Sequence, residues 1–248
     1  MSALLVDLGN TRWKAALSAG GEIGPVESGV HADVQAFRGF LVRNAVGVKR
    51  VLVASVTGDS VEQAVESEVR RCLGLPCRMI KSTDRMPNIV SGYRKPEQLG
   101  VDRLLAMVAA RANSSAPLCV IDAGTAVTMD FVDASGLHQG GFILPGLQMY
   151  RDCLLANTAI PRDSDVHVSD PLGRDTPTAV ALGARYSIAA IVETFLTGSR
   201  ALFIDQRAEI FVGGGDADQL TGLLPSPCIK LENLVLNGLA ALAAGGDV

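Results

Sequence analysis

Residues 4–11 read LLVDLGNT, an apolar run typical of a buried strand that ends in aspartate and leads into glycine and threonine. The same pattern returns at residues 118–125, which read LCVIDAGT. A buried strand that delivers a carboxylate and then turns on glycine brings backbone N–H groups and a hydroxyl close to a bound anion. The aspartate stays available to a metal or a water molecule. The two copies therefore predict two turns that bind a phosphate chain.

These motifs also have a purely structural interpretation. A single turn of this type is common in α/β proteins as a plain turn or as the capped start of a helix. Two copies in corresponding places, with GGGDA at residues 213–217 further along, favour nucleotide binding over a structural role. The glycine cluster alone is weak support, because such clusters also serve helix–sheet packing.

The composition narrows the class of protein. Of 248 residues, 48% are hydrophobic and 4% aromatic, which suits an aliphatic core of sheets covered by helices. A formal net charge of −4 gives no basic surface for nucleic acid. Five cysteines without CxxC or His–Cys spacing argue against disulfides and structural zinc and fit a reducing cytoplasm. With no signal segment or long uninterrupted apolar stretch, we expect a soluble cytoplasmic protein that does not bind a membrane.

Strand and helix patterns alternate along the chain. The first half is expected to contain strands at 4–7, 14–17, 51–55 and 77–81 and helices at 34–43, 60–73 and 99–112. The second half is expected to contain strands at 118–121, 127–132, 140–144 and 210–212 and helices at 147–155, 179–196 and 235–244. Since both halves begin with the same turn, we predict a duplicated α/β architecture of two halves, 1–115 and 116–248, with a cleft between them.

A second candidate site is the phrase GVDR at residues 100–103, where a helix is expected to begin. Asp and Arg near a helix start often serve only as a cap and a solvated neighbour. Near phosphate turns, however, Asp102 is suited to accept the proton of an attacking hydroxyl. Arg103 is then suited to hold an anionic substrate or phosphoryl oxygens.

These phrases, in this order, resemble those of the type III pantothenate kinases. The matching segments are residues 7–14, 100–103, 122–126 and 140–146, and the resemblance extends from residue 4 to about residue 240. That family belongs to the superfamily of acetate and sugar kinases, Hsp70 and actin. The resemblance implies an α/β fold of two similar ribonuclease H-like, actin-like halves with a nucleotide cleft between them.

The same resemblance implies an enzyme that phosphorylates pantothenate to 4'-phosphopantothenate, the first step of coenzyme A biosynthesis. The implied cofactors are ATP, Mg²⁺ and a monovalent cation, K⁺ or NH₄⁺. The implied partners are the small-molecule substrate pantothenate and a second copy of the chain in a homodimer, with neither nucleic acid nor membrane.

Roles are carried over from the resemblance residue by residue. Asp102 matches the catalytic base, and Asp122 matches the position that binds the monovalent cation. The positions that match nucleotide-binding residues are Asp7, Leu8, Gly9, Asn10, Thr11, Arg12, Trp13, Lys14 and Thr125, with Asp7 expected near the magnesium ion. The positions that match pantothenate-binding residues are Tyr93, Gly100, Val101, Asp102, Arg103 and Thr176.

Three points stay open on the sequence alone. Trp13, inside the first hairpin, is more often a packing residue than a stacking platform at such a position. Thr178 is an alternative to Thr176, because this chain has Asp175 where the family has asparagine and Pro177 directly after the threonine. The alternative functions are a nucleotide-binding accessory protein that regulates transcription, and a kinase of the superfamily with another acceptor.

Overall fold

The computed structural model describes residues 2–160, 171–196, 208–225 and 227–245. The chain separates into two compact units. The first consists of Met1–Ser115, Ser135–His138 and Asn233–Val248, and the second of Ala116–Ala134 and Gln139–Glu232. The first unit therefore contains the tip of a hairpin and a C-terminal helix that come from beyond residue 116.

A mixed six-stranded sheet forms the centre of the first unit, with the order β3-β2-β1-β5-β6 and β4 paired with β2. Its strands are β1 (Ser2–Leu8), β2 (Arg12–Ala19), β3 (Glu22–Ile23), β4 (Glu27–Val30), β5 (Val48–Ser55) and β6 (Cys77–Ile80). Strand β1 pairs antiparallel with β2 and parallel with β5. The first apolar run of the sequence is thus a central, fully paired strand.

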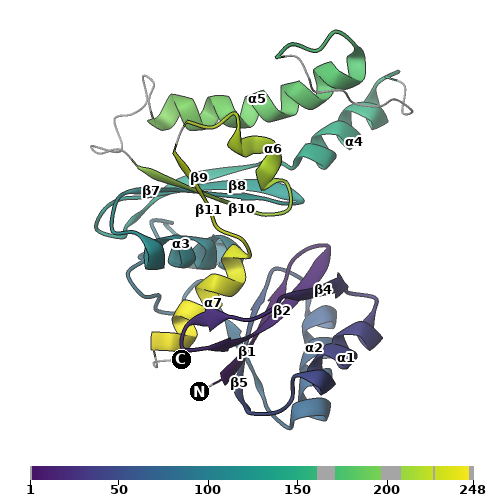
Figure 1. Cartoon of the computed structure of the whole chain (residues 1–248), viewed down its shortest axis with the longest axis vertical. Coiled ribbons are helices and arrows are strands. Elements are labelled where there is room, and N and C mark those ends of the chain that lie inside the picture. Colours follow the sequence, from purple (N-terminus) through teal and green to yellow (C-terminus); the bar gives the residue numbers. More distant parts are fainter. Residues whose placement is uncertain (1, 161–170, 197–207, 226, 246–248) are drawn as a thin grey trace. The chain divides into compact units, whose positions relative to one another are not determined.

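Helices cover both faces of this sheet (Figure 1). Helices α1 (Val34–Arg43) and α2 (Asp59–Leu73) lie on one face, where Phe37 and Phe40 pack with the strand residues Leu4 and Val6. On the other face lie α3 (Val101–Asn113) and α7 (Leu234–Gly245), with the short helix η1 (Pro96–Gln98) before α3. Because side chains alternate along a strand, β1 is apolar on both faces and Asp7 points away from α1 and α2.

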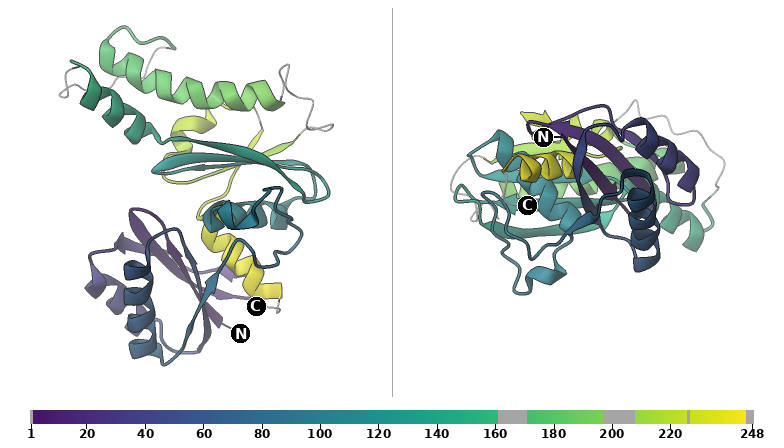
Figure 2. Two further views of the ribbon diagram at one scale, coloured as in Figure 1. Left: turned by 180° about the vertical axis from the view of Figure 1, so that it is seen from behind. Right: turned by 90° about the horizontal axis from the view of Figure 1, so that it is seen from below.

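Helices α3 and α7 cross each other, as Figure 1 and the left view of Figure 2 show. A Cβ atom added to Gly238 of α7 would lie 2.7 Å from the carbonyl carbon of Leu105 in α3. Only a glycine allows the two backbones to approach this closely. The crossing holds α3 against α7 at Leu105, one turn after the start of the helix.

The second unit is a five-stranded sheet in the order β11-β10-β7-β8-β9. Its strands are β7 (Leu118–Ala123), β8 (Ala126–Val132), β9 (His138–Pro145), β10 (Glu209–Gly213) and β11 (Cys228–Lys230). Its helices are α4 (Leu147–Asn157), α5 (Thr176–Leu196) and α6 (Ala217–Thr221). Ile188, Ala189 and Val192 of α5 are buried with strand residues such as Ile121 and Val212, so α5 covers one face of this sheet (Figure 2).

By length and composition α5 would be able to span a membrane. Its packing on the sheet is instead that of a helix in an α/β protein.

The expected α/β architecture is confirmed, and α1 runs over the predicted residues 34–43. The sequence did not predict β3, β4, η1, α6 or β11, which are short elements. It also predicted that the long helix begins at residue 179, whereas α5 begins at Thr176. Asp175 caps this helix, because its carboxylate accepts the backbone N–H of Thr178 at 2.8 Å, and Pro177 is tolerated in a first turn.

Candidate functional site

The first phosphate turn, residues 7–14, is the tight connection between β1 and β2. The N–H of Gly9 donates to the carbonyl of Arg12 at 3.1 Å, and the N–H of Val56 donates to the carbonyl of Leu8 at 3.1 Å. The side chains of Asn10, Thr11 and Arg12 are exposed at this turn. The turn is therefore held by its backbone and presents polar side chains to solvent.

Asp7 and Lys14 lie directly opposite each other in the antiparallel register of β1 and β2. Asp7 is only 9% exposed, whereas Lys14 is half-buried. Opposed residues of an antiparallel pair point to the same face of the sheet. The turn thus brings a carboxylate and an ammonium group to the same face of the sheet.

Two of the expected nucleotide-binding residues have their side chains in the core. Leu8 is fully buried, and Trp13 packs edge-on against Phe37 at a centroid distance of 5.2 Å. A nucleotide at this turn would meet only the backbone of these two residues. The packing interpretation of the Trp13 side chain is the one that agrees with this structure.

His31 is a residue near this turn to which the sequence assigned no role. Its Nε2 atom lies 2.6 Å from the carbonyl oxygen of Gly9. Because a carbonyl oxygen only accepts, Nε2 must donate this hydrogen bond. His31 therefore fixes the backbone of the turn from a position 22 residues away. No local sequence pattern predicts a contact over that separation.

The candidate acceptor site, Tyr93 with residues 100–103, lies where the chain enters α3. The carboxylate of Asp102 accepts the backbone N–H of Arg103 at 2.8 Å. A Cβ atom at Gly100 would collide with this carboxylate. The glycine leaves the space in which Asp102 sits at the first turn of the helix.

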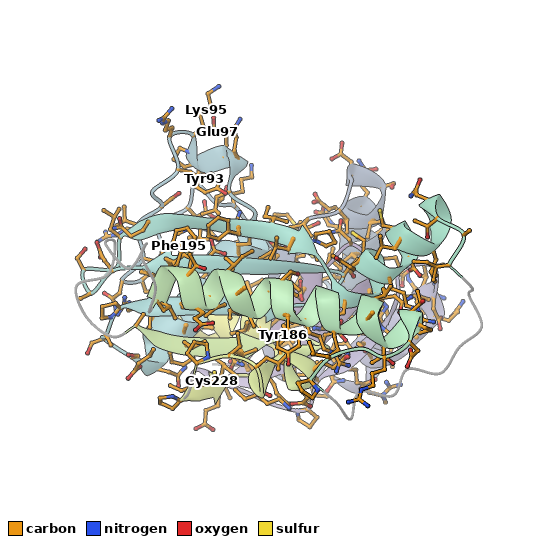
Figure 3. The ribbon with its side chains drawn as sticks, turned by 90° about the horizontal axis from the view of Figure 1, so that it is seen from above. Tyr93, Lys95, Glu97, Tyr186, Phe195 and Cys228 are labelled. Atoms are coloured by element: carbon orange, nitrogen blue, oxygen red, sulfur yellow. The ribbon has the colours of Figure 1, made fainter. Side chains whose placement is uncertain are left out.

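Arg103 and Tyr93, which the resemblance assigns to pantothenate, lie together in the structure. The guanidinium Nη1 donates to the Tyr93 hydroxyl at 2.7 Å. Arg103 is only 4% exposed, and burial of a guanidinium without partners is costly. Figure 3 shows Tyr93 at the base of the loop that carries Lys95 and Glu97 at its outer end.

The second phosphate turn, residues 122–126, lies between β7 and β8 of the second unit. Its Ala123 carbonyl accepts the N–H of Asp216 at 3.0 Å, and its Thr125 carbonyl accepts the N–H of Gly146 at 3.1 Å. Gly214, at a φ of +91°, packs against the Ala123 backbone. The two downstream glycine phrases thus pack on this turn, and Thr125 remains exposed.

Thr176 and Thr178 have different environments at the start of α5. Thr178 is 2% exposed, and its hydroxyl donates to the Asp175 carboxylate at 2.9 Å. Thr176, two residues earlier, is exposed. The Thr178 hydroxyl is thus used in the helix cap, and Thr176 is the accessible one of the two.

A divalent metal fits the first phosphate turn only if bound phosphates supply some of its ligands. In the described ranges, no three His, Cys, Asp or Glu side chains come together as a metal site. Mg²⁺ is commonly held by one or two carboxylates together with substrate phosphates and water. The single carboxylate of Asp7 suits that arrangement.

Comparison with known proteins gives the family. The model of the type III pantothenate kinase family matches residues 3–197. A type III pantothenate kinase from Azoarcus sp. (strain BH72) is 34% identical over 243 residues, which cover 97% of this chain and 90% of that protein.

Solved structures show the fold. A structure from Campylobacter jejuni, described as a Baf family transcriptional activator, matches with a TM-score of 0.65 and 18% identity over 99% of this chain and 100% of that chain. The activator of 2-hydroxyisocaproyl-CoA dehydratase from Clostridium difficile, with bound ADPNP, matches with a TM-score of 0.54 and 12% identity. The match covers 99% of this chain and 94% of that chain. These likenesses confirm the expected fold of actin-like ATPases and sugar kinases. From the motifs, the fold and the match to the family model and its sequence relatives, we conclude that this chain belongs to the type III pantothenate kinase family.

Proposed function

We propose that this protein transfers the γ-phosphoryl group of ATP to the primary alcohol of pantothenate, which yields 4'-phosphopantothenate for coenzyme A biosynthesis. The observation that carries the proposal is the family match over residues 3–197. The convergence of Tyr93 with Arg103, next to Asp102, supports an acceptor site at the start of α3.

Asp102 is the proposed general base. In phosphoryl transfer, alignment and charge neutralisation supply most of the acceleration, and the base takes the proton of the attacking hydroxyl. The Asp102 carboxylate lies in the first turn of α3, and the absence of a side chain at Gly100 leaves space beside it. A bound alcohol can therefore reach this carboxylate. Arg103, tied to the Tyr93 hydroxyl, is placed to hold the anionic substrate.

The first phosphate turn is the proposed site for the ATP phosphates. Its exposed Asn10 and Thr11 side chains, with Lys14 on β2, supply donors to phosphate oxygens. Asp7 is the proposed protein ligand of Mg²⁺, which when bound neutralises part of the phosphate charge. The bound ADPNP of the Clostridium difficile neighbour supports nucleotide binding by this fold.

In the second unit, we assign Thr125 to ATP and Asp122 to a monovalent cation, K⁺ or NH₄⁺. Asp122 is half-buried at the end of β7, beside the turn whose backbone oxygens and N–H groups are fixed by neighbouring glycine loops. Oxygen donors are the ligands such a cation requires. Thr176, with its accessible hydroxyl, is assigned to pantothenate.

A cytoplasmic homodimer is the proposed state of the enzyme. Only 28% of the most apolar 18-residue stretch of α5 is buried, and Tyr186 on this helix is exposed (Figure 3). An apolar helix face of this kind suits a self-complementary interface.

The alternative of a transcription-regulating accessory protein is not favoured. The relative that covers 97% of this chain at 34% identity is named a kinase. The structure described as a transcriptional activator is 18% identical, which shows the fold alone.

The test is a coupled assay of ADP release from the purified protein with ATP and Mg²⁺, with and without pantothenate, in potassium and in sodium buffer. We expect release that depends on pantothenate and on potassium or ammonium. The Asp122→Asn variant should lose the difference between the two buffers. ATP binding without pantothenate-dependent release would contradict the kinase proposal, and equal rates in both buffers would contradict only the cation assignment.

A further inference from the structure

His138 lies in the first unit, although the chain reaches it from β8 of the second. The tip of the β8–β9 hairpin, Ser135–His138, is held against the segment that precedes Tyr93. The N–H of Val90 donates to the carbonyl of Gly136 at 2.9 Å, and the N–H of His138 donates to the carbonyl of Val90 at 2.9 Å.

The approach of the tip is close because of one glycine. Gly136 has a φ of +88°, and a Cβ atom there would collide with the carbonyl of Asn88. An L side chain is disfavoured both by this conformation and by the collision. The backbone therefore fixes where the side chain of His138 can reach.

The imidazole of His138 stacks on the ring of Tyr93, with centroids 5.6 Å apart and an interplanar angle of 18°. His138 is 1% exposed, so its ring has little freedom to move. A Tyr ring that rests on a fixed flat surface is held against swinging towards that surface about its Cα–Cβ bond. The phenol oxygen lies at the far end of the ring, so its position depends on this swing.

The phenol oxygen is the atom that accepts the hydrogen bond from Arg103, at 2.7 Å. A displaced Tyr93 ring would lengthen or bend this bond, which is steeply dependent on angle. The guanidinium would then lose one of the contacts that orient it. The chain of contacts runs from His138 through Tyr93 to Arg103.

We propose that His138 is a positioning residue of the acceptor site, and that it orients the Tyr93 ring and through it the Arg103 guanidinium for the carboxylate-bearing substrate. This inference rests on the proposed function of Tyr93 and Arg103. His138 touches no reacting atom, so its loss should weaken substrate binding more than the chemical step.

The test compares His138→Ala and His138→Phe with the wild type, with KM measured separately for pantothenate and ATP. For His138→Ala we expect a pantothenate KM raised about tenfold, the effect of one lost hydrogen bond, and an ATP KM within about twofold of wild type. His138→Phe keeps a flat ring and should stay within about threefold of wild type for both. Calorimetric titration with pantothenate should show the same weakening without turnover.

Leu137→Ala is the matched control. This side chain is 40% exposed on the same tip, and only the Leu137 backbone takes part in the bridge to Val90. Its truncation should leave both KM values unchanged. If His138→Ala does not fold, His138→Leu against His138→Phe makes the same comparison at nearly constant volume.

A double-mutant cycle decides whether His138 acts through Tyr93. In Tyr93→Phe the hydroxyl is absent, so adding His138→Ala should raise the pantothenate KM by less than about twofold further. Additive effects, or equal losses for both substrates, would overturn the inference. A wild type without pantothenate-dependent ADP release would instead overturn the proposed function, whereas an active wild type matched by His138→Ala would overturn the inference alone.

Discussion

The crossing of α3 and α7 predicts that Gly238→Ala destabilises the first unit. A Cβ at this position would lie 2.7 Å from the carbonyl carbon of Leu105 and 2.9 Å from its Cα. Carbon atoms in good contact are about 3.5 Å apart, so relief of the contact with the carbonyl carbon alone requires the two helices to separate by about 0.8 Å, and the Leu105 carbonyl oxygen would lie closer still. Both helices are buried here, and the obstructing atoms are backbone, which cannot rotate away.

The magnitude follows from two opposing effects. Overpacking of a core costs about 1–3 kcal/mol, and a backbone collision belongs at the upper end of that range. Alanine in place of glycine inside a helix contributes about 1 kcal/mol of stabilisation. The net loss is about 2 kcal/mol, which for a chain of this size lowers Tm by about 4–8 °C.

The same substitution inside α5 is the control. Gly183 is exposed, and an added Cβ would meet only the Tyr150 hydroxyl, at 3.8 Å. Gly183→Ala should therefore be neutral or stabilising by up to about 1 kcal/mol.

Thermal and urea unfolding of both variants, with ADP release measured in parallel, test the reasoning. Because Leu105 lies one turn after Asp102, a displacement of α3 should also lower kcat of Gly238→Ala on the order of tenfold. A Gly238→Ala protein as stable as wild type, with an unchanged urea dependence, would refute the account of the helix crossing.

Three further predictions concern the site and the fold. Asp102→Asn should retain ATP binding, measured by titration calorimetry, and lose on the order of a hundredfold or more in kcat; near-normal turnover would rule it out as the base. His31→Ala removes the donor to the Gly9 carbonyl and should raise the KM for ATP about tenfold with little change in the KM for pantothenate, whereas a rise for pantothenate alone would contradict this role. A hydrogen bond from Arg38, the largest cause, and one from Arg71 lower the pKa of Glu68 from 4.5 to about 2. The contribution of ionised Glu68 to the stability of the fold is therefore present above pH 4.5 and is lost as the pH falls towards 2. Because both arginines are partly exposed to solvent, Glu68→Gln should cost no more than about 1 kcal/mol at pH 7 in urea unfolding, and the difference from wild type should shrink at pH 3. A difference independent of pH would show that the ion pair is not its source.

Much of the fold was predictable from local patterns. The apolar run that became β1 and the helical spacing that became α1 specify their own conformations. The short elements were missed because two or three paired residues carry no periodicity, as in β3 and β11. The start of α5 was missed because Asp175 followed by Thr-Pro reads as a loop, although the carboxylate caps a helix.

The candidate site was predictable where its residues are adjacent in sequence. Residues 7–14 form one turn, and residues 100–103 open one helix, so their proximity needs no long-range contact. Leu8 and Trp13 show the limit of that reasoning, since the alternation of strand side chains sends both into the core. His31 and His138 could not be found by such local reasoning, because their partners Gly9 and Tyr93 are far away in the sequence.

The sequence by itself determined most of the longer strands and helices and the two Asp–x–Gly turns, because hydrophobic periodicity and glycine act within a few residues. Only the tertiary structure decided that His31 would hold Gly9, that His138 would stack on Tyr93, and that Gly238 would let α7 cross α3. Each of these contacts joins residues far apart in the chain. Their geometry depends on the packing of whole elements, and no local pattern encodes it.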